Sequence, residues 1–148
     1  MNSSDIQPLL ATLLANTDSV YSKAKLATGA PAIVTGIGIE DCSVLLDSTT
    51  NPSQCLITVN RMHKSTSRFV GGTDVVYNQQ VEINVISKAG QAICSELADL
   101  VEDCLHDTNT VAYGGSTIGV NFVNIGRMPL RDENFWRDVI TFDVLGIE

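Results

Sequence analysis

The sequence predicts an α+β fold, with a mostly antiparallel β-sheet packed against two main α-helices and a long flexible arm between two strands. Two observations predict the helices: an apolar stripe at helical spacing opens the chain, and residues 74–106 change from alternating to helical periodicity across a short joint. Further alternating apolar runs predict the remaining strands. No linker, internal repeat or low-complexity tract interrupts the chain, so residues 1–148 are expected to form a single domain.

The first helix is predicted close to the N-terminus. Ser4 and Gln7 have the spacing of a capping box, in which each side chain satisfies a backbone N–H of the first turn. The Gly29–Pro31 stretch is a stop and turn signal further along the chain. The apolar stripe between these signals is Ile6, Leu9, Leu10, Leu13 and Leu14.

Two stretches of strand-like sequence follow. Residues 31–40, PAIVTGIGIE, predict a strand whose two glycines suggest a bulge or a close backbone approach. Residues 43–60 give a second apolar run, a turn around Asn51-Pro52 and another strand. That last strand alternates at Cys55, Ile57 and Val59.

The apolar alternation lapses between Arg61 and Thr73, which predicts the long arm. A long connection inside a compact domain is uncommon unless it is functional or disordered. Arginine and aromatic residues are enriched in the cores of interfaces, so the arm is predicted to contact another subunit or a partner. A loop without a role and a nucleic-acid contact remain alternatives. The predicted interface residues, which include three of the nine basic residues of the chain, are Arg61, Lys64, Arg68 and Phe69.

The arm leads into a long strand and then into the second helix. Val81, Ile83 and Val85 share one side of the strand. The joint at residues 87–90 carries no catalytic residue and is therefore interpreted as scaffold. The apolar stripe of the helix is Ile93, Leu97, Leu100, Val101, Cys104 and Leu105. Its carboxylates, interpreted as a solvated face, are Glu96, Asp99, Glu102, Asp103 and Asp107.

The C-terminal part predicts two further strands. Residues 108–116 are expected to form a loop, 118–126 a strand, and 128–134 a turn. Asp132, Glu133 and Asp138, near Trp136, are expected to pair at the surface with Arg131 and Arg137. One face of that strand should carry Trp136, Ile140, Phe142 and Val144.

Composition narrows the classes of function. A hydrophobic content of 44% with 18% charged residues excludes disorder of the whole chain. The formal charge of −8 argues against nonspecific binding along nucleic acid, although it leaves a local basic patch possible. The longest apolar runs are far shorter than the ~20 residues that a membrane span requires. The N-terminus also lacks the basic and apolar pattern of a secretory signal.

No pattern of catalytic or metal-binding residues emerges. The four cysteines lack CxxC spacing, which favours reduced thiols over a disulfide. Cys104 and His106 lie two apart on a helix and diverge by ~200°, which disfavours zinc. His63 and His106 are interpreted as solvated or capping residues, and no nucleophile, phosphate-cradle or metalloprotease motif occurs. We therefore predict no catalytic, cofactor-binding or metal-binding residue, and no enzyme.

The order of elements nevertheless resembles a known family. The strand and helix in QQVEINVISKAGQAICSELADLVEDCL, residues 79–105, and the closing WRDVITFDVLG, residues 136–146, carry the resemblance. They are similar to tail terminator, or tail completion, proteins of long-tailed bacteriophages, which are often filed as minor capsid proteins. The resemblance covers most of the chain as an order of elements.

The resemblance implies a non-enzymatic virion protein without a cofactor. Such a protein would form a homo-oligomeric, hexameric ring that caps the head-proximal end of the tail tube and stops its elongation. Its partners would be the tail tube protein and a neck or head-completion protein, with genomic DNA passing through the lumen without specific binding. The ring would assemble in the host cytoplasm and reside in the virion. The alternatives are a head-completion or neck adaptor, another tail structural protein, or, in a different class, a small cytoplasmic ligand-binding domain or enzyme.

Overall fold

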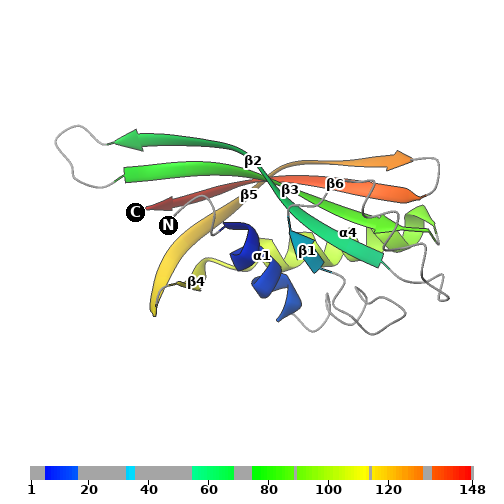
Figure 1. Ribbon diagram of the computed structural model, residues 1–148, viewed down its shortest axis with the longest axis horizontal. Coiled ribbons are helices and arrows are strands. Elements are labelled where there is room, and N and C mark those ends of the chain that lie inside the picture. The colour runs from blue at the N-terminus through cyan, green and yellow to red at the C-terminus, as the bar shows by residue number, and fades with distance from the viewer. Residues whose placement is uncertain are drawn as a thin grey trace.

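A computed structural model describes residues 6–16, 33–35, 55–68, 75–88, 90–113, 115–131 and 135–147 (Figure 1). The helices are α1 (Ile6–Ala15) and α4 (Gln91–His106). The strands are β1 (Ile33–Thr35), β2 (Cys55–Arg68), β3 (Val75–Ser87), β4 (Thr110–Tyr113), β5 (Ser116–Arg131) and β6 (Trp136–Ile147).

These strands form one six-stranded sheet in the order β1-β2-β3-β6-β5-β4. The short β1 pairs with β2 in parallel, and every other pairing in this sheet is antiparallel. The long strands cross one another near the middle of the molecule because the sheet is strongly twisted (Figure 1). The predicted α+β fold is thus confirmed.

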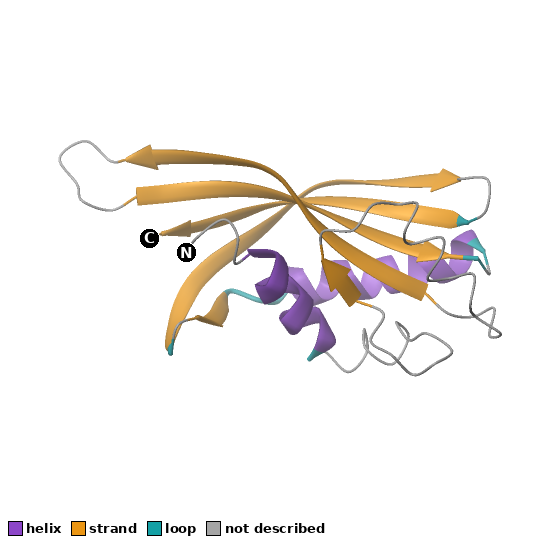
Figure 2. Ribbon diagram, viewed as in Figure 1, coloured by secondary structure: helices purple, strands orange, loops and turns teal. Residues whose placement is uncertain are grey.

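Both helices lie on the same side of the sheet (Figure 2). The strands turn one face toward them, and the register aligns Val85, Ile83 and Val81 of β3 with Asp138, Ile140 and Phe142 of β6 on that face. Apart from Asp138 these side chains are apolar and join the core. The core residues contributed by the helices are Leu10, Leu14, Cys94, Leu97, Ala98, Val101 and Leu105.

The predicted change from strand to helix is confirmed. β3 ends at Ser87 and α4 begins at Gln91. Gly90 between them has φ 151°, a conformation that L side chains rarely adopt, so glycine is required at this joint. At the other end of α4, Thr108 Oγ1 donates to the carbonyl of Cys104 at 2.7 Å and satisfies one of the last backbone acceptors.

Helix α1 confirms the predicted N-terminal stripe, with Leu10 and Leu14 fully buried. The Gln7 side chain donates to the carbonyl of Val59 in β2 at 3.2 Å and so ties the helix to the sheet. Ser4, the other half of the predicted capping box, lies outside the described residues. Of the strand predicted over 31–40, the described part is Ile33–Thr35, and the apolar run before Cys55 lies outside.

The prediction that the chain leaves the sheet at Arg61 is wrong. Strand β2 continues to Arg68, which pairs with Val75 of β3. A bulge between Arg61 and Lys64 shifts the register within this ladder. The ladder is made of backbone hydrogen bonds, which do not require apolar side chains, so the lapse in alternation did not mark the end of the strand. The segment is therefore the outer part of a β-hairpin at one end of the molecule (Figure 1).

Two boundaries near the C-terminus also differ from prediction. Thr110–Tyr113, expected in a loop, forms β4 and pairs with Ser116–Gly119 of β5. Gly115 in the connecting turn has φ 81°, which explains the glycine there. Residues 128–131, expected in a turn, continue β5 up to Arg131 despite Pro129. Proline lacks an N–H and is tolerated in strands mainly at sheet edges, where β5 lies over this range.

Candidate interaction surface

Strand β5 lies at the edge of the described sheet over most of its length. From Asn121 to Arg131 its ladder within the described part of the chain is with β6 alone, because β4 covers only Ser116–Gly119. The large exposed hydrophobic side chains of the described residues all belong to this strand: Val123, Ile125 and Met128 are 40%, 50% and 59% exposed. Exposed apolar side chains on an unpaired edge are typical of an interaction surface.

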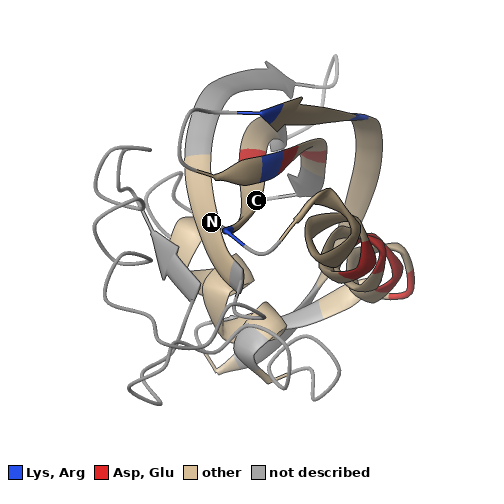
Figure 3. Cartoon of the chain, turned by 90° about the vertical axis from the view of Figure 1, so that its right-hand side faces the viewer, with Lys and Arg blue, Asp and Glu red and all other residues tan. Residues whose placement is uncertain are grey.

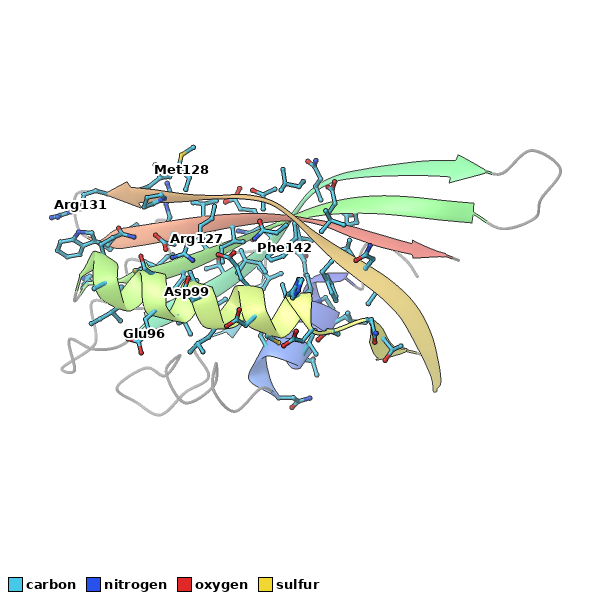
Figure 4. The ribbon with its side chains drawn as sticks, turned by 180° about the vertical axis from the view of Figure 1, so that it is seen from behind. Glu96, Asp99, Arg127, Met128, Arg131 and Phe142 are labelled. Atoms are coloured by element: carbon cyan, nitrogen blue, oxygen red, sulfur yellow. The ribbon has the colours of Figure 1, made fainter. Side chains whose placement is uncertain are left out.

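A bulge redirects the side chains of β5. Asn124 lies opposite Phe142 and Gly126 lies opposite Thr141, so Ile125 is the extra residue. The extra residue shifts the alternation by one position. As a result the odd-numbered Arg127 points toward α4, and the even-numbered Met128 points away from the helix (Figure 4).

Arg127 joins β5, β6 and α4 through all three nitrogens of its guanidinium. Its Nη1 lies 2.5 Å from Asp99 Oδ1 and 2.8 Å from Glu102 Oε1. Its Nη2 lies 3.0 Å from Asp138 Oδ2 and donates to the carbonyl of Ser95 at 3.2 Å, while Nε donates to Asp138 Oδ2 at 3.1 Å. Charge-assisted bonds of this kind are about twice as strong as neutral ones.

The electrostatics of this network favour the charged guanidinium. Partial burial by itself lowers the pKa of Arg127, but hydrogen bonds to Asp99 and Glu102, followed by the charges of Asp138 and Asp99, raise the pKa overall. Asp138 is fully buried and also accepts a hydrogen bond from the Gln91 side chain. The predicted surface pairing of Asp138 with Arg131 or Arg137 is therefore wrong: its carboxylate is buried and its cationic partner is Arg127.

Residues of α4, β5 and β6 line a pocket of about 180 Å³ next to this network. We call the Arg127 network and this pocket together the groove. Asn124 donates to Glu102 Oε2 at 2.8 Å, so Glu102 belongs both to the Arg127 network and to the pocket lining. No described residue donates a side-chain hydrogen bond to the Asp103 carboxylate at the rim. The acidic residues of α4 follow its outer side (Figure 3). The cavity lining consists of Glu102, Asp103, His106, Phe122, Asn124 and Phe142.

The interface residues predicted from the sequence lie elsewhere. Arg61, Lys64 and Arg68 belong to β2 in the outer part of the hairpin. Their side chains are outside what the structure describes, and so is Phe69 altogether. The structure therefore brings the three cations onto one strand, and their role as an interface stays a prediction.

Sequence reasoning missed the groove residues Arg127, Asn124 and Glu102. A weak signal was present, because a glycine inside a strand pattern often marks a bulge, and Gly126 follows Asn124-Ile125. The solvated-face interpretation of the α4 acids was only partly right: Asp103 is exposed, whereas Glu102 is half-buried and bonded to both other groove residues.

The structure describes the side chains of two of the four cysteines, Cys94 and Cys104. Neither is in a disulfide, and Cys94 Sγ donates to the carbonyl of Trp136 at 3.3 Å. The reduced state of the four cysteines stays a prediction. Among the described residues, no group of three or more His, Cys, Asp or Glu side chains is placed to hold a metal ion.

Across the described ranges, neither helix has the length and apolarity needed to cross a membrane.

Comparisons with known proteins show the fold. No family model matches the chain, and the curated proteins contain no match either. Among solved structures, the chain is similar to one in the virion of a native gene transfer agent particle, with a TM-score of 0.63 and 16% identity. The match covers 97% of this chain and 95% of the other. A second solved chain, whose name states no function, gives a TM-score of 0.52 at 16% identity and covers 100% of this chain and 96% of its own.

Proposed function

We propose that the protein is a structural component of a virion and, more specifically, a ring-forming tail terminator. The observation that carries the proposal is the shared fold with a chain of a virion particle over nearly the full length of both. The order of elements in the sequence also resembles that of phage tail terminators. We treat residues 1–148 as one tail-terminator-like domain that acts by binding other proteins, without catalysis.

The surface of the molecule suits head-to-tail assembly. A heterologous ring requires two different patches on each subunit, which pair in one direction until the rotation closes. The chain offers two candidates: the β2–β3 hairpin, whose sequence carries Arg61, Lys64 and Arg68, and the edge of β5, where Val123, Ile125 and Met128 are exposed. A hexameric ring of this kind would cap the tail tube on one side and contact the neck or a head-completion protein on the other.

The charge of the chain suits a conduit for DNA. With a formal charge of −8, each subunit repels the phosphate backbone on average. Genomic DNA would therefore pass through the lumen without specific binding. We place the protein in the virion after assembly in the host cytoplasm.

Deleting the gene for this chain from the genome of the particle tests the position of the protein in the tail. A terminator predicts tails of uneven length that fail to join heads, and a plasmid copy should restore both. Electron microscopy of the lysate measures tail length and head attachment in the same images. Tails of correct length that remain unjoined would instead favour the alternative, a neck or head-completion adaptor. Normal, head-joined tails without the protein would overturn both readings.

A second test addresses the hairpin. Arg68→Glu combined with Phe69→Ala should leave the subunit folded, as judged by far-ultraviolet circular dichroism, yet abolish complementation of the deletion. Full infectivity of particles that carry this double variant would show that the predicted hairpin residues are not part of an interface.

A further inference from the structure

The exposed part of β5 has the sequence of a strand that pairs readily with other chains. Residues 120–125, VNFVNI, alternate strand-forming residues with asparagine and contain no charge and no proline. Short segments of this composition are the type that stacks into cross-β assemblies. Within the described part of the chain, residues 121–131 pair with β6 alone, and Val123 and Ile125 are 40% and 50% exposed. An edge of this kind associates with other strands unless a local feature prevents it.

The backbone shows which groups of β5 point to its outer edge, the side away from β6. Val120 N–H donates to the carbonyl of Asn109 at 3.0 Å, so Val120 directs its backbone groups away from β6. In an antiparallel ladder, alternate residues direct these groups to opposite sides. Phe122 and Asn124 therefore also direct their backbone groups to the outer edge.

The bulge at Ile125 interrupts this regular pattern. Before it, even-numbered residues of β5 pair with even-numbered residues of β6, and after it they pair with odd-numbered ones. Beyond the bulge the backbone groups at the outer edge are therefore those of Arg127, Pro129 and Arg131. A strand that approached from outside could not follow β5 in one register, because a bulge bends and twists the strand that carries it.

Pro129 lies at one of these outward positions. Its ring nitrogen carries no hydrogen, so the outer edge offers no donor at this point. A carbonyl of an incoming strand opposite Pro129 would be left without a partner, which costs free energy. A proline at the neighbouring Leu130 would instead have removed a hydrogen bond to β6, because Leu130 directs its backbone groups to that strand.

Both features leave little regular edge to pair with. Strand β4 and Asn109 cover β5 up to Val120, and the bulge begins at Ile125. Only residues 121–124 lie between these limits, which is shorter than the usual five or six residues of a strand. Bulges and prolines on exposed strands are known means by which proteins avoid edge-to-edge association.

We propose that the Ile125 bulge and Pro129 together prevent strand addition at the outer edge of β5. The inference concerns the free subunit, so it does not rest on the proposed ring. It also limits how a neighbour binds here: a partner that covers Val123, Ile125 and Met128 contacts their side chains and does not extend the sheet.

Three full-length variants test the proposal. Pro129→Val restores an N–H at the outer edge. Deletion of Ile125 removes the bulge and keeps Asn124 opposite Phe142. Leu130→Val is the matched control, because it adds the same strand-forming residue at a position whose backbone groups face β6. Circular dichroism and urea unfolding measure folding and stability, and sedimentation velocity with thioflavin T fluorescence measures association.

The wild type and Leu130→Val are expected to form no thioflavin-positive assemblies. Pro129→Val should associate about tenfold more tightly than Leu130→Val, since a restored backbone hydrogen bond has an effect of this order. Combining Pro129→Val with the deletion should strengthen association further. Hydrogen exchange of the assemblies should show newly protected amides within residues 121–131. Adding Val123→Lys to the combined variant should abolish association, because a lysine on an edge opposes strand pairing.

Three results would overturn the inference. The first is a folded Pro129→Val protein that associates no more than the wild type, and this variant decides the matter alone if the deletion does not fold. The second is equal association by Leu130→Val, which would assign the effect to strand propensity. The third is amide protection that lies outside residues 121–131. The proposed function is judged separately, by the tails that form when the gene is deleted.

Discussion

The two sides of helix α4 differ in the kind of contact that their residues make. On the core side Leu97, Val101 and Leu105 are fully buried against the sheet. On the groove side Asp99 and Asp103 are exposed, and Glu102 is half-buried. The core side uses nonspecific apolar burial, which any suitable pattern of residues supplies. The groove side uses a few charged contacts whose geometry depends on one bulge in β5, and so its chemistry is far more sensitive to position.

The largest effect is expected on the core side. Leu97→Asp buries a carboxylate in an apolar environment and should cost about 4 kcal/mol or more, enough to unfold a domain of marginal stability. Circular dichroism with thermal melting measures the loss. Ala92→Asp is the control, because Ala92 is exposed on the same helix, and it should change the free energy of unfolding by less than about 0.5 kcal/mol. A folded Leu97→Asp protein would contradict the assigned core.

The next largest loss of stability is expected at Arg127, at the filled end of the groove. Arg127→Leu removes the cationic partner of Asp138, which is buried, and should cost about 3 kcal/mol because a buried charge is left uncompensated. Urea unfolding measures this difference. Adding Asp138→Leu to Arg127→Leu should recover most of the loss, since no buried charge then remains. If the double variant is no more stable than the single one, the buried pair is not the source of the effect.

The core side could be predicted from the sequence, and the groove could not. Periodicity alone identified Leu97, Val101 and Leu105, because apolar burial follows the 3.6-residue repeat. It missed Ala98, which is small enough to pack closely against the sheet and carries little apolar signal. Burial of Cys94 was expected from the tendency of thiols to be buried, not from periodicity.

The local pattern of the sequence could not predict which distant residues pair with one another. The contact of Arg127 with Asp138 joins residues eleven apart on antiparallel strands, and its register depends on the extra residue Ile125. The sequence equally allowed Arg131 or Arg137 as the partner. The β2 strand beyond Arg61 was missed for a related reason: its pairing with β3 is made by backbone groups, which the side-chain pattern does not report.

A smaller effect is expected where the two ends of the groove meet. Asn124→Ala removes the 2.8 Å hydrogen bond to Glu102 and should cost about 0.5–1 kcal/mol, because both groups are accessible to water. Asn121→Ala is the matched control from the same exposed strand and should cost less. Urea midpoints at constant slope give both values. Equal costs for the two variants would mean that the hydrogen bond does not stabilise the groove.

The smallest effect on stability is expected at Asp103, an exposed residue that lines the pocket. Asp103 lies in the last turn of α4, where the negative end of the helix dipole disfavours a carboxylate and favours a cation. Lysine at this position would also stand four residues after Asp99, a spacing that stabilises helices. Asp103→Lys should therefore raise the free energy of unfolding by about 0.5 kcal/mol. Glu96→Lys, nearer the helix N-terminus, should give no such gain. Thermal melts of dilute, monomeric protein measure the stability of both variants. A loss of more than about 1 kcal/mol for Asp103→Lys would make Asp103 a structural residue, because changes at exposed positions without a structural role usually stay within about 0.5 kcal/mol.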